Sequence, residues 1–218
     1  MAAVLETLEA EAQARHLRVL GGFHPGPEDG APDGCATLLM IGPGEPAFWP
    51  AFQASPEYRD GAAHPLDRWS KRVLGGWAET LGARAIYPSD GPPYAPFIVW
   101  AKATGRVWNS PAGILVHDRA GLMVSFRGAL ALRERIALPP APACPCEGCH
   151  KPCLDACPVG ALGVGGYDVP GCKAYLDTAA GEDCMARGCA VRRSCPLSQR
   201  YGRAEAQSAF HMRSFHPA

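Results

Sequence analysis

Cysteines crowd the last third of the chain, and they are the residues with the greatest chemical potential. Of the ten cysteines among 218 residues, nine fall between Cys144 and Cys195. The first twenty residues lack the basic leader and apolar stretch of a signal peptide, so we expect a reducing, cytoplasmic setting in which disulfides are rare. Grouped thiolates in such a setting are typical ligands of zinc or of iron–sulfur clusters.

The first group of cysteines follows the spacing of a ferredoxin run. It has the form Cys-x2-Cys-x3-Cys-x3-Cys-Pro and consists of Cys146, Cys149, Cys153 and Cys157. Bacterial ferredoxins have one residue fewer between the second and third cysteines, and in two-cluster ferredoxins the fourth cysteine serves the other cluster. Three closely spaced thiolates can hold three irons of a cubane, so we predict a [4Fe-4S] cluster here.

A second, more widely spaced group allows a second cluster. Its members are Cys172, Cys184, Cys189 and Cys195. The eight thiols divide into two sets of four. The first set is Cys146, Cys149, Cys153 and Cys195, and the second set is Cys157, Cys172, Cys184 and Cys189. Cys35 and Cys144 remain, and we expect both to be free thiols.

A zinc site is the alternative, because Cys-x2-Cys followed by later cysteines is also zinc-ribbon spacing. Zinc sites use two separated pairs, whereas here three or four cysteines fall in one run, which favours iron–sulfur. His150 has a thiolate on either side and is interpreted as tuning solvent contact. Arg192 and Arg193 could offset the charge of the clusters and raise their potential, although solvated basic residues are the simpler interpretation.

The residues before the cysteines predict an α/β (α+β) domain. Apolar spacing predicts, in chain order, helices at 2–19, 66–81 and 97–103 and strands at 36–41 and 84–87. Two further apolar runs, at 113–116 and 122–126, predict a hairpin with Gly121 available for a positive φ. Prolines between the second strand and the third helix predict a surface loop, where binding residues are often found.

A proline-rich run between Leu138 and Cys144 predicts a stiff linker and a domain boundary. We therefore expect an α/β domain at residues 1–138 that binds a cofactor or substrate, and a small ferredoxin-like [4Fe-4S] domain with a C-terminal arm at 139–218. Lys+Arg and Asp+Glu are equal at 21 each, which disfavours nucleic acid as a partner. No apolar stretch approaches the roughly 18 residues of a membrane span.

The cysteine region resembles the iron–sulfur part of the epoxyqueuosine reductases in the order and local context of residues 146–162, the run Cys172-Lys-Ala-Tyr-Leu, and residues 184–196. Upstream, residues 84–93 look like that family's strand followed by Asp-x-x-Pro. The resemblance implies that the α/β domain binds cobalamin and that Asp90 is a proton donor. From the residues alone, Asp90 merely shapes a proline turn.

The resemblance covers only part of that family's features. No Asp-x-His-x-x-Gly run is present to supply an axial histidine to a corrin. Nothing like the family's helical repeats, which help to hold transfer RNA, follows the cysteines. We therefore do not expect epoxyqueuosine itself to be the substrate.

We predict an iron–sulfur protein that passes single electrons from its clusters to a cofactor or substrate in the first domain. The electrons would come from a donor protein such as a ferredoxin or flavodoxin. The polar contacts expected around the cofactor are Ser89, Tyr94, His117 and Arg127. If a substrate is turned over, the protein is an iron–sulfur, cobalamin-dependent reductase. The alternatives are a non-catalytic electron carrier and a cluster-bearing sensor or scaffold.

Overall fold

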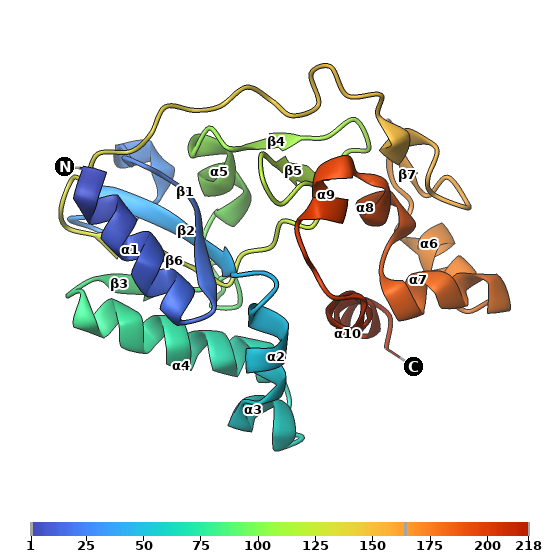
Figure 1. Ribbon diagram of the computed structural model, residues 1–218, viewed down its shortest axis with the longest axis horizontal. Coiled ribbons are helices and arrows are strands. Elements are labelled where there is room, and N and C mark those ends of the chain that lie inside the picture. The colour runs from blue at the N-terminus through green and yellow to red at the C-terminus, as the bar shows by residue number, and fades with distance from the viewer. Residues whose placement is uncertain (1, 164, 218) are drawn as a thin grey trace. The chain divides into compact units, whose positions relative to one another are not determined.

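The chain divides into two compact units in the computed structural model, which describes residues 2–163 and 165–217 (Figure 1). Unit 1 comprises residues 1–106 and 125–142, and unit 2 comprises residues 107–124 and 143–218. This division differs from the boundary predicted after residue 138, because residues 139–142 belong to unit 1 and an internal segment of the predicted first domain belongs to unit 2. The segment Val107–Val124 belongs to the same unit as the grouped cysteines.

Unit 1 is built on a four-stranded antiparallel sheet with the strand order β1-β2-β6-β3. The strands are β1 (Leu17–Phe23), β2 (Thr37–Pro43), β6 (Gly128–Leu132) and β3 (Arg84–Ile86). All seven residues of β2 are buried, as are all five residues of β6. This burial explains why the apolar run of β2 is continuous rather than alternating, and the strand predicted there is confirmed.

The helices of unit 1 are α1 (Ala2–Ala14), α2 (Phe48–Gln53), α3 (Pro56–Arg59), α4 (Pro65–Thr80) and α5 (Phe97–Ala103), with a short 3-10 turn, η1 (Pro27–Asp29). Helix α4 lies against β3 and β6 and buries Leu66, Trp69, Leu74 and Trp77. The rings of Trp69 and Phe48 pack edge to face, with their centroids 5.2 Å apart. The helices predicted at 66–81 and 97–103 are confirmed, because each presents an apolar face to the core.

The helix predicted at residues 2–19 is too long. It ends at Ala14, His16 adopts a left-handed φ of 58°, and the chain continues as the edge strand β1. A left-handed residue cannot continue a right-handed helix, so the backbone reverses there. Pairing of β1 with β2 then decides the conformation of Leu17–Phe23.

The predicted hairpin is also wrong in its strands. Strand β4 (Val107–Asn109) pairs with β5 (Leu115–His117), whereas residues 122–126 form no strand. Gly121 does have a positive φ, 57°. Strand β6 had no counterpart in the predictions, because alternation of Ala and Leu is compatible with helix as well as strand.

Unit 2 contains the hairpin and a cysteine-rich region that is largely helical. Its other elements are η2 (Pro152–Leu154), β7 (Leu162–Gly163), β8 (Gly166–Tyr167), α6 (Val169–Leu176), η3 (Ala179–Gly181), α7 (Glu182–Arg187), α8 (Ala190–Ser194), α9 (Pro196–Arg200) and α10 (Glu205–Phe215). The C-terminal helix α10 packs against α7. The prediction of a mixed α/β protein is confirmed, but a ferredoxin-like fold for this region is not.

A small apolar core in unit 2 joins the hairpin to the cysteine region. Its buried members are Ala112, Val116, Leu122, Cys153, Leu162 and Val191. Four further cysteines pack against this core, namely Cys146, Cys157, Cys189 and Cys195. The cysteines are therefore held by the packing of the unit as well as by their own turns.

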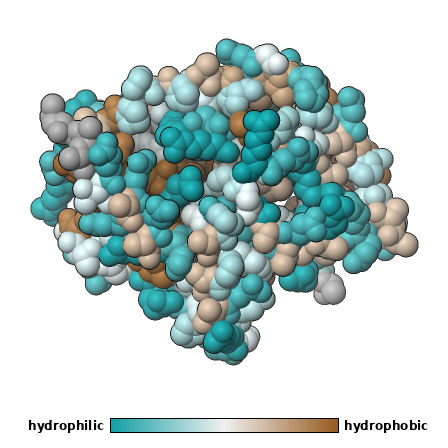
Figure 2. Space-filling model, viewed as in Figure 1, coloured by the Kyte–Doolittle hydropathy of each residue, from teal (hydrophilic) through white to brown (hydrophobic). Residues whose placement is uncertain are grey.

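The outer surface mixes residue types on the face shown in Figure 2, where hydrophilic and hydrophobic residues are interspersed. In the described part of the chain, no helix combines the length and the apolar character that crossing a bilayer requires.

Candidate metal centre

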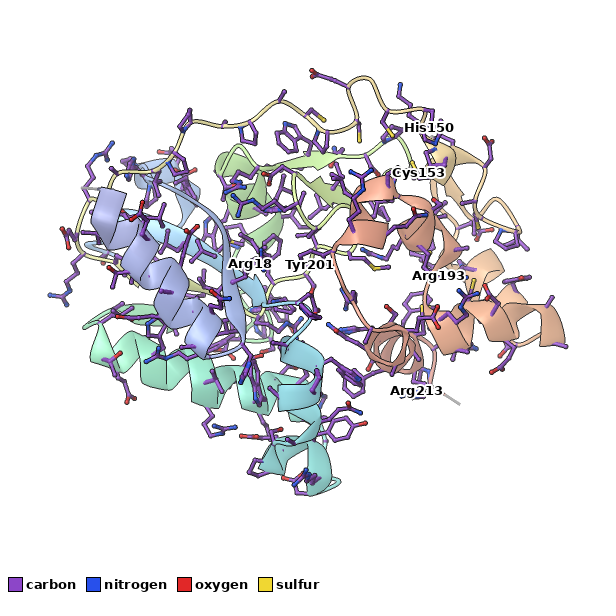
Figure 3. All side chains as sticks on the ribbon, viewed as in Figure 1. Arg18, His150, Cys153, Arg193, Tyr201 and Arg213 are labelled. Carbon is purple, nitrogen blue, oxygen red and sulfur yellow. The ribbon has the colours of Figure 1, made fainter. Side chains whose placement is uncertain are left out.

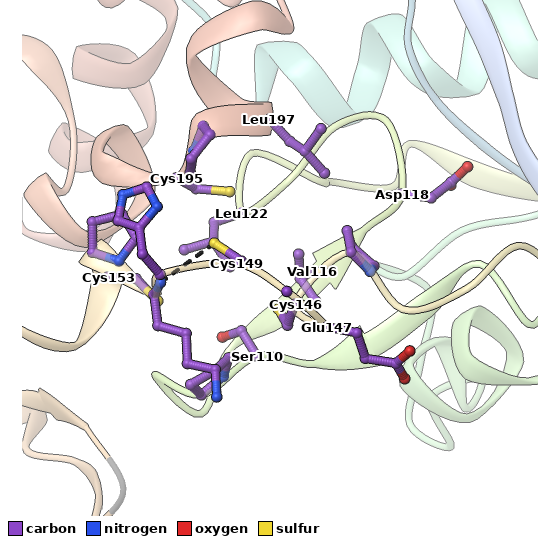
Figure 4. Close-up of a pocket in the computed structure, with 17 residues that line it drawn as sticks. Ser110, Val116, Asp118, Leu122, Cys146, Glu147, Cys149, Cys153, Cys195 and Leu197 are labelled. Atoms are coloured by element: carbon purple, nitrogen blue, oxygen red, sulfur yellow. Dashed lines mark hydrogen bonds between the residues drawn. The ribbon is translucent and has the colours of Figure 1, made fainter.

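A cavity of about 380 Å³ in unit 2 is lined by four cysteines from two distant segments of the chain. They are Cys146, Cys149, Cys153 and Cys195 (Figure 4). Figure 4 also shows the carboxylates of Asp118 and Glu147 on the side of the cavity away from Cys195. The same four cysteines were grouped from spacing as the first ligand set. The fold thus brings together the thiols that a shared site needs.

Tight turns position the three thiols of the run. The backbone N–H of Cys149 donates to the carbonyl of Cys146 at 3.4 Å. Lys151 adopts a left-handed φ of 56°, and its N–H donates to Cys149 Sγ at 3.4 Å, the dashed line in Figure 4. Backbone N–H groups that donate to sulfur stabilise the thiolate form. Cys153 follows in the 3-10 turn η2 and is only 6% exposed.

The fourth thiol is set by the start of α9. Cys195 occupies the N-cap of this helix, with Pro196 at its first position. The proline fixes its own φ and disfavours helical geometry at Cys195, which has an extended backbone with ψ of 125°. The Cys-Pro pair therefore ends α8 and begins α9 at the cavity wall.

Burial and the neighbouring thiols raise the pKa values of two thiols of this set. Burial raises the pKa of Cys146 to about 11, and the thiols of Cys144, Cys153 and Cys149 add to the rise. Burial also raises the pKa of Cys153, and the neighbouring thiol of Cys195 contributes to that rise. Thiolates this close repel one another unless a cation offsets their charge. The positive charge of a bound metal would do so, and it would keep its thiol ligands deprotonated.

The donor type of the cavity is one that both iron–sulfur clusters and zinc use. Four cysteine thiols are the usual ligands of a [4Fe-4S] cluster, and Val116 and Leu122 supply apolar wall. A single zinc ion instead needs its ligands within about 2.0–2.3 Å of one point. Across residues 2–163 and 165–217, no three His, Cys, Asp or Glu side chains are arranged to hold one ion.

His150 and Cys144 lie beside the cavity thiols. His150 lines the cavity and is exposed (Figure 3), and the solvent-contact role interpreted for it stays a prediction. Cys144 contacts the Cys146 thiol, although the spacing of the cysteines placed Cys144 in neither ligand set. Cys35 lies in unit 1, where its Sγ donates to the carbonyl of Thr37 at 3.4 Å.

Two tyrosines, Tyr175 and Tyr167, lie near members of the second set of cysteines. Cys157 and Cys184 both add to the raised pKa of Tyr175, for which burial is the largest cause. Cys172 accepts a hydrogen bond from Tyr167 Oη at 3.5 Å, and Cys189 also lies near that hydroxyl. The N–H of Ala161 donates to Cys157 Sγ at 3.2 Å. All four belong to unit 2.

The predicted polar residues of the first domain are mostly exposed. Ser89 and Tyr94 are exposed, Tyr94 at 65%. The Asp90 carboxylate is 49% exposed and forms an ion pair with Lys71 at 2.6 Å. Arg127 differs, because its Nε is buried and has no hydrogen-bond partner among the described residues. Burial lowers the pKa of Arg127, and the charge of Asp67 opposes this effect.

His117 does not accompany these residues, because it belongs to unit 2. It is only 1% exposed. Its Nδ1 accepts hydrogen bonds from the backbone N–H groups of Arg119 and Ala120, at 3.0 and 3.2 Å. These hydrogen bonds stabilise the turn that follows β5. His117 is therefore a structural residue of the hairpin.

Comparison with known proteins gives no match. The chain matches no protein-family model, no curated protein and no solved structure. The likeness to epoxyqueuosine reductases therefore rests only on the context of the cysteines and on residues 84–93.

Proposed function

We propose that this protein is an iron–sulfur redox protein that holds a [4Fe-4S] cluster in the cavity of unit 2. The observation that carries the proposal is the set of four thiols, from Cys146, Cys149, Cys153 and Cys195, around one cavity. When bound, such a cluster supplies one-electron chemistry whose potential depends on hydrogen bonds and solvent access. A ferredoxin-like arrangement of this region is part of the same proposal.

The protein's own groups would set the environment of that cluster. The N–H of Lys151 donates to Cys149 Sγ, and the buried side chains of Val116 and Leu122 limit water at the wall. The hydrogen bond would stabilise the thiolate, and the apolar side chains would keep water away from the sulfurs. Both are established ways of tuning the properties of a metal site. The second set, Cys157, Cys172, Cys184 and Cys189, would hold a second cluster in the same unit.

Unit 1 would supply the acceptor of the electrons. We propose that Ser89, Asp90, Tyr94 and Arg127 contact a cofactor or substrate there, and that this cofactor is cobalamin, as the resemblance implies. Support comes from Arg127, since a buried donor without a partner is costly unless a ligand satisfies it. Asp90 would deliver a proton, and a cytoplasmic ferredoxin or flavodoxin would supply electrons.

The cluster assignment is tested by metal analysis of protein purified without oxygen. We expect about eight irons per chain, because each of the two clusters holds about four. Cys153→Ser should remove about half of the iron, because it deletes a ligand of the first set. The matched control Cys35→Ser should keep all of it, because Cys35 bonds to a backbone carbonyl of unit 1.

Equal iron in the two variants would contradict the ligand assignment, and zinc in place of iron would contradict the cluster. Mass spectrometry of the same samples decides between the functional alternatives. A co-purified corrin supports the reductase, whereas clusters without any small molecule support an electron carrier, a sensor or a scaffold.

A further inference from the structure

Tyr167 is held beside Cys172 by an unusual local arrangement. The two-residue strands β7 and β8 pair at Leu162 and Tyr167, and Gly166 takes a φ of 112° to close the turn. Asp168 follows and caps α6, with its Oδ1 accepting from the N–H of Gly171 at 3.0 Å. Ribbon and cap together fix how the Tyr167 side chain faces Cys172.

The phenol is directed at sulfur although the residue has access to water. Tyr167 is 42% exposed, yet its Oη donates to Cys172 Sγ at 3.5 Å. Its ring stacks on that of Phe215 in α10, with centroids 6.1 Å apart and planes at 19°. Stacking of this kind restrains the ring, so the hydroxyl is held in place rather than left to exchange among water partners.

A positive charge lies near Cys189 and the Tyr167 hydroxyl. The guanidinium of Arg192 is close to both Cys189 and Tyr167, and burial is the main cause that lowers its pKa. Its Nη1 donates to the carbonyl of Leu122, which ties the side chain to the hairpin segment of unit 2. The Tyr167 hydroxyl therefore lies near Cys172 and Cys189, and an anchored cation lies near Cys189.

We propose that Tyr167 and Arg192 are positioning residues that raise the reduction potential of the second cluster. This inference rests on the proposed function, in which Cys172 and Cys189 are ligands of that cluster. Reduction adds one negative charge to a cluster and its thiolates. A hydrogen bond to sulfur and a nearby cation both stabilise the more negative state, so both favour reduction.

The test compares Tyr167→Phe with Tyr175→Phe in the full chain, purified without oxygen. Tyr175 is the matched control, because it also lies near two cysteines but its Oη donates to the carbonyl of Ala180, at 2.7 Å. Potentials are measured by redox titration followed by electron paramagnetic resonance. At the wild-type midpoint of the second cluster, Tyr167→Phe should lower the reduced-to-oxidised ratio about tenfold, which corresponds to about 59 mV. Tyr175→Phe should leave the ratio close to one.

Arg192 provides an independent arm if Tyr167→Phe does not retain its iron. Arg192→Gln should lower the potential more than Arg192→Lys, because lysine preserves the positive charge. Iron content is measured in every variant. Full iron content with unchanged potentials in Tyr167→Phe and Arg192→Gln would overturn this inference and leave the proposed function standing. A wild-type chain with no second cluster would overturn both the inference and the second ligand set.

Discussion

The ion pair between Glu57 and Arg72 joins a nearly buried carboxylate to a half-exposed guanidinium. Glu57 is 10% exposed at its side chain and accepts two hydrogen bonds from Arg72, at 2.5 and 3.0 Å. The hydrogen bond from Arg72 is the main cause that lowers the pKa of Glu57 to about 2, while partial burial opposes it. A bidentate arginine–carboxylate pair of this kind is among the stronger pairs in proteins.

We expect the Glu57–Arg72 pair to make stability depend on pH. Because the folded pKa lies below the unfolded value of 4.5, the pair stabilises the protein above about pH 4.5, and this stabilisation is lost as the pH falls towards 2. Glu57→Gln should cost on the order of 1–2 kcal/mol near pH 7, allowing for the exposure of Arg72.

Urea denaturation at a series of pH values from 7 to 2.5 gives the free energy of unfolding of wild type and of Glu57→Gln. The effect is the difference between these two free energies at each pH. The difference should shrink in acid. The control Glu28→Gln, at an exposed position in the turn η1, should run parallel to wild type throughout. A constant difference between Glu57→Gln and wild type at all pH values would contradict the expected linkage.

At the scale of elements, the contact between the turn after β5 and α9 helps to determine where Cys195 lies. Gly121 has a φ of 57°, and the N–H of its neighbour Leu122 donates to Ser198 Oγ at 2.9 Å. A Cβ at Gly121 would lie 2.6 Å from the backbone nitrogen of Ser198. Ser198 is only three residues after Cys195, so the glycine supports the cavity wall.

Gly121→Ala should therefore destabilise unit 2 by on the order of 2–3 kcal/mol, through backbone strain and the clash with Ser198. It should also lower the iron bound by the first ligand set. Gly34→Ala is the control for strain alone, since Gly34 has a φ of 74° and no atom within 4 Å of an added Cβ. Thermal denaturation and iron analysis measure both effects. Equal losses in the two variants would show that the α9 contact is unimportant.

At the scale of the whole molecule, the two units are not consecutive in the chain. The segment Val107–Val124 leaves unit 1 and joins unit 2, where Ser110, Val116 and Leu122 line the cysteine cavity. Ala112, Val116 and Leu122 are also buried in the core of unit 2. A C-terminal fragment cut at the proline-rich linker lacks all of these residues.

We expect a fragment of residues 139–218 to bind less iron than the intact chain and to unfold without cooperativity. It lacks one wall of the cavity and half of its small apolar core. Small domains bury a smaller fraction of their surface on folding and are therefore only marginally stable. A fragment of residues 107–218 restores the hairpin and should recover most of the iron. Circular dichroism and iron analysis compare them. Wild-type iron content in the shorter fragment would contradict the division into these units.

The sequence was sufficient where a structure depends on neighbours along the chain. The periodicity of α4 and α5 and the apolar run of β2 were recognised because a helix face or a buried strand is a local pattern. The strand β6 and the true partner of β5 were missed. Strand pairing joins residues far apart in the chain, and the local pattern of Ala and Leu does not reveal it.

The cysteines show the same limit at the candidate site. Spacing alone was enough to group Cys146, Cys149 and Cys153, because residues so close along the chain must stay close in space. Cys195 was assigned to the same set only by dividing eight thiols into two fours, and the tertiary structure shows it on the wall of their cavity. The tertiary structure also sets Tyr167 against Cys172 and places the hairpin in the cysteine unit. These contacts arise from packing between distant segments, whose free energy depends on the surfaces that meet rather than on any short run of residues.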